Sequence, residues 1–150
     1  MHHTVYLRDT FLDNRYTKQS LKLQSQPRGM DVLKKQNIVI VASVTEIAIV
    51  EDNRKVNALK VGYEPSSVSV SPDRDVAVGG TTDNKVHIFG LDNTNLVPKL
   101  ELDHLGAVTD VAYSPNGKYL VACDAYRKVI LYNVPEYKVM YTSTRKMCSL

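Results

Sequence analysis

Histidine, cysteine and acidic side chains could supply acid–base, metal or thiol chemistry, so their spacing is considered first. The chain of 150 residues has four histidines. His2 and His3 form a terminal pair, which favours a disordered end over a pair of metal ligands. His87 alternates with apolar neighbours in a strand-like run, so we expect a packed or hydrogen-bonded ring rather than a catalytic one. We expect His104 to be structural as well.

The two cysteines, Cys123 and Cys148, have neither the spacing of a zinc site nor that of a disulfide framework. Cys123 ends an apolar run and is predicted to be a buried thiol, which favours a reducing, cytoplasmic location. Asp73, Asp83 and Asp124 fall at turns, where aspartate is expected for its local hydrogen bonds. No nucleophile elbow, P-loop or Cys-x-x-Cys pattern occurs. We therefore predict a protein that is not an enzyme and has no catalytic residue, cofactor or metal.

The charge of the chain is too small and too scattered to indicate nucleic acid or a membrane surface as a partner. The formal net charge is +3. Basic pairs such as Lys34-Lys35 and Arg127-Lys128 fall at expected turns, where solvated loops carry them. No apolar run approaches the roughly 18 residues of a membrane span, and the first residues lack the apolar core of a signal peptide.

A strand pattern recurs along the chain. Val68–Asp73 and Val111–Asn116 share their pattern at a spacing of 43 residues, and Val86–Phe89 matches Val129–Tyr132 at the same spacing. A weaker copy near Met30–Val32 precedes the first of these by 38 residues. A period of ~40–45 residues with several short strands in each is typical of β-propeller blades.

The pattern predicts an all-β propeller fragment of about three four-stranded blades with partial flanking blades. Turn signals such as Asp83-Asn84 and Asn116-Gly117 separate the strands. The expected strands are 29–33, 38–42, 46–50, 56–61, 67–71, 75–80, 85–89, 97–102, 108–113, 119–123, 129–132 and 138–142. The corresponding division is a part-blade at 1–26, blades at about 27–62, 63–103 and 104–143, and the start of a next blade at 144–150.

The ends of the chain are expected to fall inside blades. Residues 4–7 and 21–24 look like the two outer strands of a blade, and 147–150 looks like the opening of another. A propeller needs about four to eight blades to close. We therefore expect a truncated gene model, a partial sequence or a splice product, which needs the remaining blades or self-association.

The stretch Asp103–Leu120 resembles the core of a WD repeat, with His104 in the place of the family's histidine. The Trp-Asp pair is replaced by Phe89-Gly90 and Tyr132-Asn133, so an aromatic ring still fills the site. The resemblance implies a buried His–Ser–Asp hydrogen-bond network. His104 and Asp124 would supply part of it, and the network is expected to be incomplete in every copy.

Several further strings, in their order and spacing, are similar to the actin-interacting protein 1 family of WD-repeat proteins. They are Val61–Pro65, Val76–Gly80, Gly106–Ser114 and Leu120–Ala125, within a similar region from about Leu21 to Val134. The resemblance places this region in the C-terminal propeller of that family. It implies actin filaments and ADF/cofilin as partners, cofilin-dependent filament severing and disassembly, and a place in the cytoplasmic actin cytoskeleton. The best-known contacts of the family lie largely on the other propeller, so no contact residue is carried over.

Tyr63 and Glu64 are the candidate partner-binding residues. They lie between the last strand of one expected blade and the first strand of the next, and such connections surface on one face of a propeller. The alternative is a rigid turn held by Pro65. Tyr113, Tyr119 and Tyr132, like Tyr63, are expected to be packed, with their hydroxyl groups hydrogen-bonded.

Two other functions remain open at this point. One is a WD-repeat scaffold for another assembly, such as a ubiquitin-ligase adaptor. The other is a propeller enzyme with a metal in the central channel. The enzyme needs polar residues converging on the channel, whereas the expected first strands consist mostly of Val, Ser and Tyr, which places it last.

Overall fold

The computed structural model describes residues 3–9, 17–23 and 25–144. This part of the chain is almost entirely β-strand, with one short 3-10 helix, Lys34–Gln36, and no helix long and apolar enough to cross a membrane. Three four-stranded antiparallel sheets follow one another, each in chain order. They are β3 (Pro27–Leu33), β4 (Ile38–Ser43), β5 (Glu46–Glu51) and β6 (Arg54–Lys60); β7 (Pro65–Val70), β8 (Asp75–Gly80), β9 (Lys85–Asp92) and β10 (Asn95–Asp103); and β11 (Val108–Tyr113), β12 (Tyr119–Asp124), β13 (Lys128–Asn133) and β14 (Val139–Thr144). The predicted all-β class and the pattern of four-stranded sheets are confirmed.

A fourth, two-stranded sheet lies at the N-terminal end. β1 (His3–Asp9) pairs antiparallel with β2 (Thr17–Leu23), where the sequence predicted two outer strands. His3 begins β1 and pairs with Leu23, so the prediction of a disordered end was wrong for this residue. The strand expected at 147–150 lies outside the described residues.

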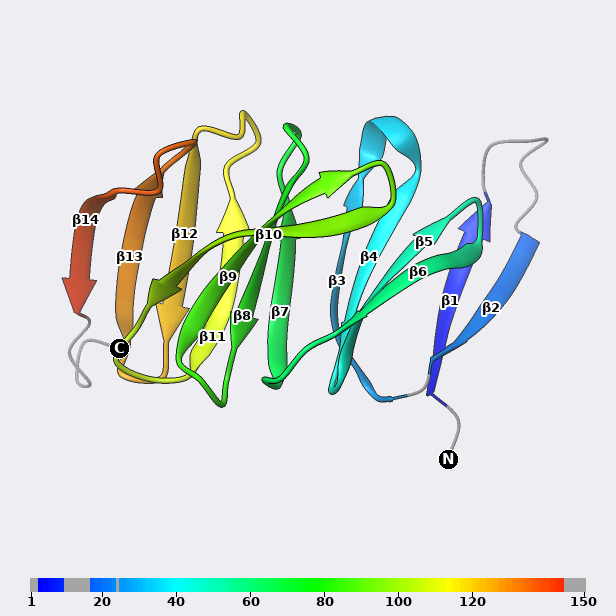
Figure 1. Cartoon of the computed structure of the whole chain (residues 1–150), viewed down its shortest axis with the longest axis horizontal. Coiled ribbons are helices and arrows are strands. Elements are labelled where there is room, and N and C mark those ends of the chain that lie inside the picture. Colours follow the sequence, from blue (N-terminus) through cyan, green and yellow to red (C-terminus); the bar gives the residue numbers. More distant parts are fainter. Residues whose placement is uncertain (1–2, 10–16, 24, 145–150) are drawn as a thin grey trace.

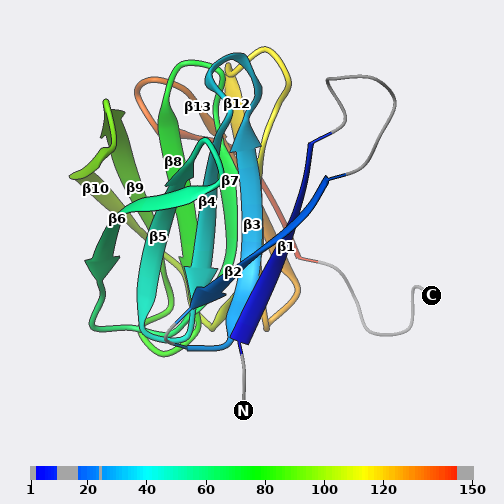
Figure 2. The same ribbon diagram turned by 90° about the vertical axis from the view of Figure 1, so that its right-hand side faces the viewer.

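The three larger sheets stack face to face (Figure 1). Their first strands lie side by side, and β7 contacts both β3 and β11. Figure 2 shows that the last strands β6 and β10 lie on the opposite side of the stack from β3 and β7. This radial order of strands, repeated from sheet to sheet, is the arrangement of propeller blades.

Apolar side chains fill both spaces between the sheets. Val76 and Val78 of β8 face the first sheet, while Ala77 faces the third, and all three are fully buried. The strand β8 is therefore packed on both faces. Burying one Val or Ile side chain contributes roughly 1.5–3 kcal/mol, so the two clusters are the main source of cohesion between the sheets.

Hydrogen bonds between sheets repeat at matching positions of the first strands. The Asp31 carboxylate accepts a bond from the backbone N–H of Val70 at 2.7 Å, and the Ser69 hydroxyl accepts one from Tyr113 at 3.0 Å. Each bond ties the first strand of one sheet to that of the next, so the inner side of the stack is held at a fixed spacing.

The predicted turns at Asp83-Asn84 and Asn116-Gly117 have the backbone that their residues favour, whereas the turn at Arg74 does not. Arg74, Asn84 and Gly117 all adopt positive φ, at 69°, 59° and 74°. Arginine is unusual in this region. Its guanidinium group offsets the strain by donating to the carbonyl oxygens of Leu91 at 2.8 Å and Asn93 at 2.9 Å.

One buried position was predicted wrongly. Cys123 is half-buried rather than buried, because it lies on the face of β12 turned away from the second sheet. Partial burial, together with the nearby carboxylates of Asp110 and Asp124, raises the pKa of its thiol. Cys148 lies outside the described residues.

Candidate functional site

One end of the stack carries the connections that link consecutive sheets and the turns beside them. Antiparallel pairing brings 61–64 and 104–107, which join the sheets, to the same end as the turns 81–84 and 125–127 (lower end of Figure 1). We call these four segments the linker face. Both candidate residues, Tyr63 and Glu64, lie on it.

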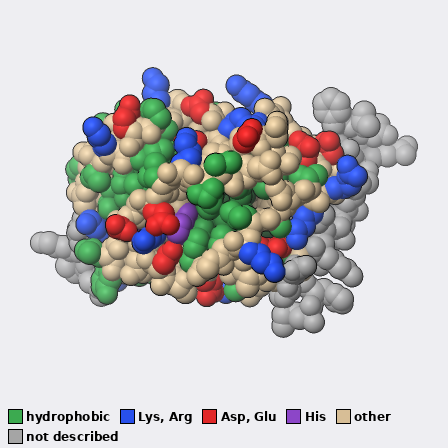
Figure 3. Space-filling model, in the orientation of Figure 1, with side chains coloured by type: hydrophobic (Ala, Val, Ile, Leu, Met, Phe, Trp, Pro, Cys, Tyr) green, Lys and Arg blue, Asp and Glu red, His purple; other side chains and the backbone are tan. Residues whose placement is uncertain are grey.

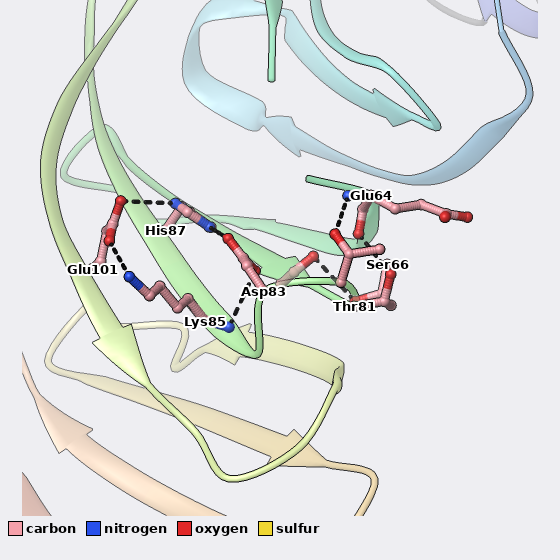
Figure 4. Close-up of polar contacts among 9 residues, drawn as sticks. Glu64, Ser66, Thr81, Asp83, Lys85, His87 and Glu101 are labelled. Atoms are coloured by element: carbon pink, nitrogen blue, oxygen red, sulfur yellow. Dashed lines mark hydrogen bonds and ion pairs between the residues drawn. The ribbon is translucent and has the colours of Figure 1, made fainter. Parts of the chain in front are cut away.

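The segment that carries Glu64 is fixed by bonds to the neighbouring turn (Figure 4). Its carbonyl oxygen accepts bonds from the backbone N–H and the hydroxyl of Thr81, both at 2.9 Å. Its N–H donates to the Thr82 hydroxyl at 3.1 Å. Pro65 follows and is buried. The linker is therefore held as a defined turn, which presents its side chains in one arrangement.

The Glu64 carboxylate accepts a hydrogen bond from the Arg28 guanidinium at 2.9 Å, across the boundary between the first and second sheets. The two side chains are 41% and 37% exposed. An ion pair in contact with solvent contributes only about 0–1 kcal/mol. Glu64 can therefore exchange this partner for another cation at small free-energy cost.

Tyr63 is packed inward. Its ring stacks on the imidazole of His87, with centroids 3.7 Å apart and planes 3° apart. Its hydroxyl is buried and has no hydrogen-bond partner among the described residues, so the predicted bond is missing. Burial, reinforced by the negative charges of Asp83 and Glu101, raises the pKa of Tyr63 above its ordinary value.

His87 connects the turn to the rim of the second sheet. Its Nε2 lies 2.7 Å from the Asp83 carboxylate, and its Nδ1 lies 3.7 Å from that of Glu101. Since a carboxylate only accepts, Nε2 carries the proton of this bond. This confirms the prediction of a packed, hydrogen-bonded histidine. Lys85 donates to Glu101 at 2.9 Å, and this bond lowers the pKa of Glu101 and raises that of Lys85.

A groove of about 620 Å³ opens beside this cluster, between β6 and β10. Leu59, Val61, Pro98 and Leu100 supply apolar walls, and His87 also lines the groove. Figure 3 shows hydrophobic side chains gathered in a hollow on this side, with charges of both signs around it. An apolar centre with a charged rim is suited to non-covalent contact with a protein surface. No group of three His, Cys, Asp or Glu side chains in the described ranges could hold a metal ion.

A second polar cluster lies beneath the next linker. His104 Nδ1 lies 3.1 Å from Asp124, and both side chains are fully buried. Because the carboxylate accepts from Nδ1, the free Nε2 accepts from the Tyr132 hydroxyl at 3.1 Å. The predicted contribution of His104 and Asp124 is confirmed. Tyr132 takes the tryptophan position, and burial raises its pKa to about 12.

The remaining tyrosines differ from one another. The Tyr113 hydroxyl bonds to that of Tyr137 at 2.8 Å, and Tyr137 donates in turn to the buried carboxylate of Asp75. Tyr113 thus follows the prediction. Tyr119 does not, because it is 38% exposed.

Sequence reasoning missed two residues of the linker face, Leu105 and Tyr126, which are 70% and 67% exposed. Both lie close to a residue of the WD-like pattern. Leu105 comes directly after His104, and Tyr126 comes two residues after Asp124. That adjacency was the available signal.

Comparison with known proteins agrees with this architecture. The family model "WD domain, G-beta repeat" matches residues 96–133. The chain is 55% identical to actin-interacting protein 1 of Drosophila melanogaster over 126 residues, which is 83% of this chain and 21% of that protein. It is 40% identical to actin-interacting protein 1 of Caenorhabditis elegans over 75% of this chain and 18% of the relative. It is 35% identical to WD repeat-containing protein 1 of Gallus gallus over 81% of this chain and 21% of the relative. The chain thus spans about a fifth of the length of these curated relatives.

Proposed function

The chain is a WD-repeat protein that resembles actin-interacting protein 1, and on that premise we propose that it acts in the disassembly of actin filaments. It serves as a non-enzymatic, filament-binding part of a protein that promotes cofilin-dependent severing. Its partners are actin filaments and ADF/cofilin, and its place of action is the cytoplasmic actin cytoskeleton. The three sheets, with boundaries at about 27–62, 63–103 and 104–143, are its blades.

The observation that carries this proposal is the 55% identity to the Drosophila protein across 83% of the chain. The name of that relative states an interaction with actin. The geometry supports binding as the mode of action. The connections between sheets are rigid, one face collects them, and the groove beside that face has apolar walls and a charged rim. Preorganised surfaces of this kind lose little conformational entropy when a partner binds.

We place the contact at Tyr63 and Glu64. Glu64 is the more direct contact, because its carboxylate is half exposed and held only by a solvent-accessible ion pair. Tyr63 contributes by fixing the linker through its stack on His87. Replacing both by alanine in the complete protein is expected to slow filament disassembly. Unchanged disassembly by a variant with unchanged melting temperature would remove these two residues from the contact.

Co-sedimentation with actin filaments tests the function itself. The complete protein is mixed with filaments, with and without saturating cofilin, and the pelleted fraction is measured. We expect pelleting that increases strongly with cofilin. A folded protein that stays in the supernatant in both conditions would contradict the proposal and favour a scaffold for another assembly.

A further inference from the structure

Two apolar side chains on the linker face are far more exposed than their type predicts. Leu105 and Tyr126 are 70% and 67% exposed, the highest values among the large hydrophobic residues of the described ranges. Single exposed apolar residues are common on protein surfaces. These two lie together and come from separate connections, one from the β10–β11 linker and one from the β12–β13 turn.

Backbone contacts hold the two connections against each other. The N–H of Ala125 donates to the carbonyl of Ala107 at 2.8 Å. The Tyr126 ring lies directly on Gly106, since a Cβ at this glycine would be 2.4 Å from its Cδ2. Leu105 precedes that glycine. The absence of a side chain at position 106 therefore leaves room for the Tyr126 ring against the backbone of the residue that follows Leu105.

The buried network beneath the pair fixes both of its members. Asp124 bonds to His104, which immediately precedes Leu105. The other oxygen of the same carboxylate accepts from the backbone N–H of Tyr126 at 2.9 Å and of Lys128 at 3.1 Å. One fully buried carboxylate thus positions the backbone on both sides of the exposed pair.

This arrangement has the properties of a binding hot spot. Ordering a flexible side chain at an interface costs about 0.5–1.5 kcal/mol, and here the backbone beneath the pair is already ordered. Aromatic anchors with a polar surround dominate many protein interfaces. Charged residues of both signs, Asp103 and Arg127, are close to the pair in the sequence, and both are exposed. Mixed charge favours a protein partner over nucleic acid or an anionic membrane, which require a surface of one sign.

The pair is continuous with the contact proposed above. The backbone N–H of His104 donates to the carbonyl of Asn84 at 2.8 Å. Asn84 adjoins Asp83, the hydrogen-bond partner of His87 beneath Tyr63. The two linkers therefore belong to one bonded surface.

We propose that Leu105 and Tyr126 form a docking point for the cofilin-decorated actin filament, presented by Gly106 and the Asp124–His104 network. This inference rests on the proposed function and adds a second contact to the linker face.

Affinity for cofilin-decorated filaments tests the docking point. The complete protein is compared with the double variant Leu105→Ser and Tyr126→Ser by co-sedimentation over a range of filament concentrations. We expect the double variant to bind at least about tenfold more weakly, as a hot spot would. The matched control is Val97→Ser, which removes a residue 48% exposed on the rim strand β10 and away from the linker face. It should bind like the wild type, and melting temperatures verify that all variants are folded.

Gly106→Ala tests the presentation of the pair without removing either side chain. The added methyl group would displace the Tyr126 ring, so a several-fold loss of affinity is expected. If the wild type does not pellet with decorated filaments, the proposed function fails. If it does, and both the double variant and Gly106→Ala bind as tightly as Val97→Ser, the docking point is wrong and the proposed function stands.

Discussion

At the scale of single residues, the buried cluster of His104, Asp124 and Tyr132 shows how a WD-type network persists without tryptophan. The resemblance of Asp103–Leu120 to a WD repeat implied the roles of His104 and Asp124 correctly. The sequence also predicted that the Tyr132 ring is packed and its hydroxyl hydrogen-bonded, but it did not identify His104 as the partner of that hydroxyl. The ring also closes the network through its hydroxyl, which bonds to His104 at 3.1 Å.

Tyr132→Phe tests this network. The change removes one hydroxyl and leaves a buried nitrogen of His104 without its donor. An unsatisfied buried polar group costs about 1–3 kcal/mol, so the free energy of unfolding should fall by that amount in urea titrations. Tyr119→Phe is the matched control, because Tyr119 is 38% exposed, and its effect should stay within about 0.5 kcal/mol. Equal stability of the two variants would exclude the bond.

Buried tyrosines make stability depend on alkaline pH. Burial raises the pKa of Tyr132 to about 12, and it also raises the pKa values of Tyr63, Tyr113 and Tyr137. A folded pKa above the unfolded value gives a contribution that is complete below about pH 10 and is lost as the pH rises toward the folded value. We therefore expect the free energy of unfolding to be constant from pH 8 to 10 and to fall above pH 10.

The check is absorbance of ionised tyrosine, measured in the folded protein. The four tyrosines with a raised pKa, of nine in the chain, should ionise only above pH 10, as the protein unfolds. A single transition near pH 10 for all nine would contradict the burial described here.

At the scale of elements, strand positions could be predicted because they depend on local information. Two-residue alternation, paired turn residues and the period of about 43 residues placed the strands close to where β3–β14 lie. The side-chain partners across sheets could not be predicted in this way. Only tertiary packing brings together the segments that carry them. Examples are the stacking of Tyr63 on His87 and the contact of the Tyr126 ring with Gly106.

Ile88→Ala tests the importance of packing between the second and third sheets. Ile88 of β9 is 1% exposed and belongs to the cluster between them. Truncating a buried isoleucine usually costs about 2–5 kcal/mol because a cavity remains. Urea unfolding should show a loss of that size, whereas Val97→Ala on the exposed rim should change stability by less than about 0.5 kcal/mol. A loss below 1 kcal/mol for Ile88→Ala would mean that the two sheets do not pack as described.

At the scale of the whole molecule, three stacked sheets provide one surface that no single sheet contains. The groove between β6 and β10 and the ion pair of Glu64 with Arg28 arise only where neighbouring sheets meet. A repeated unit thus acquires distinct sites through its connections, which differ in sequence from one sheet to the next. The chain spans about a fifth of the length of its curated relatives, so the tests of the proposed activity use the complete protein.

The most direct test of the account is the rate at which single actin filaments are severed under a microscope. The complete protein is added to bare filaments and to filaments decorated with cofilin. We predict that severing accelerates on decorated filaments and that bare filaments remain unaffected. Equal severing of decorated filaments with and without the protein would contradict the proposed function.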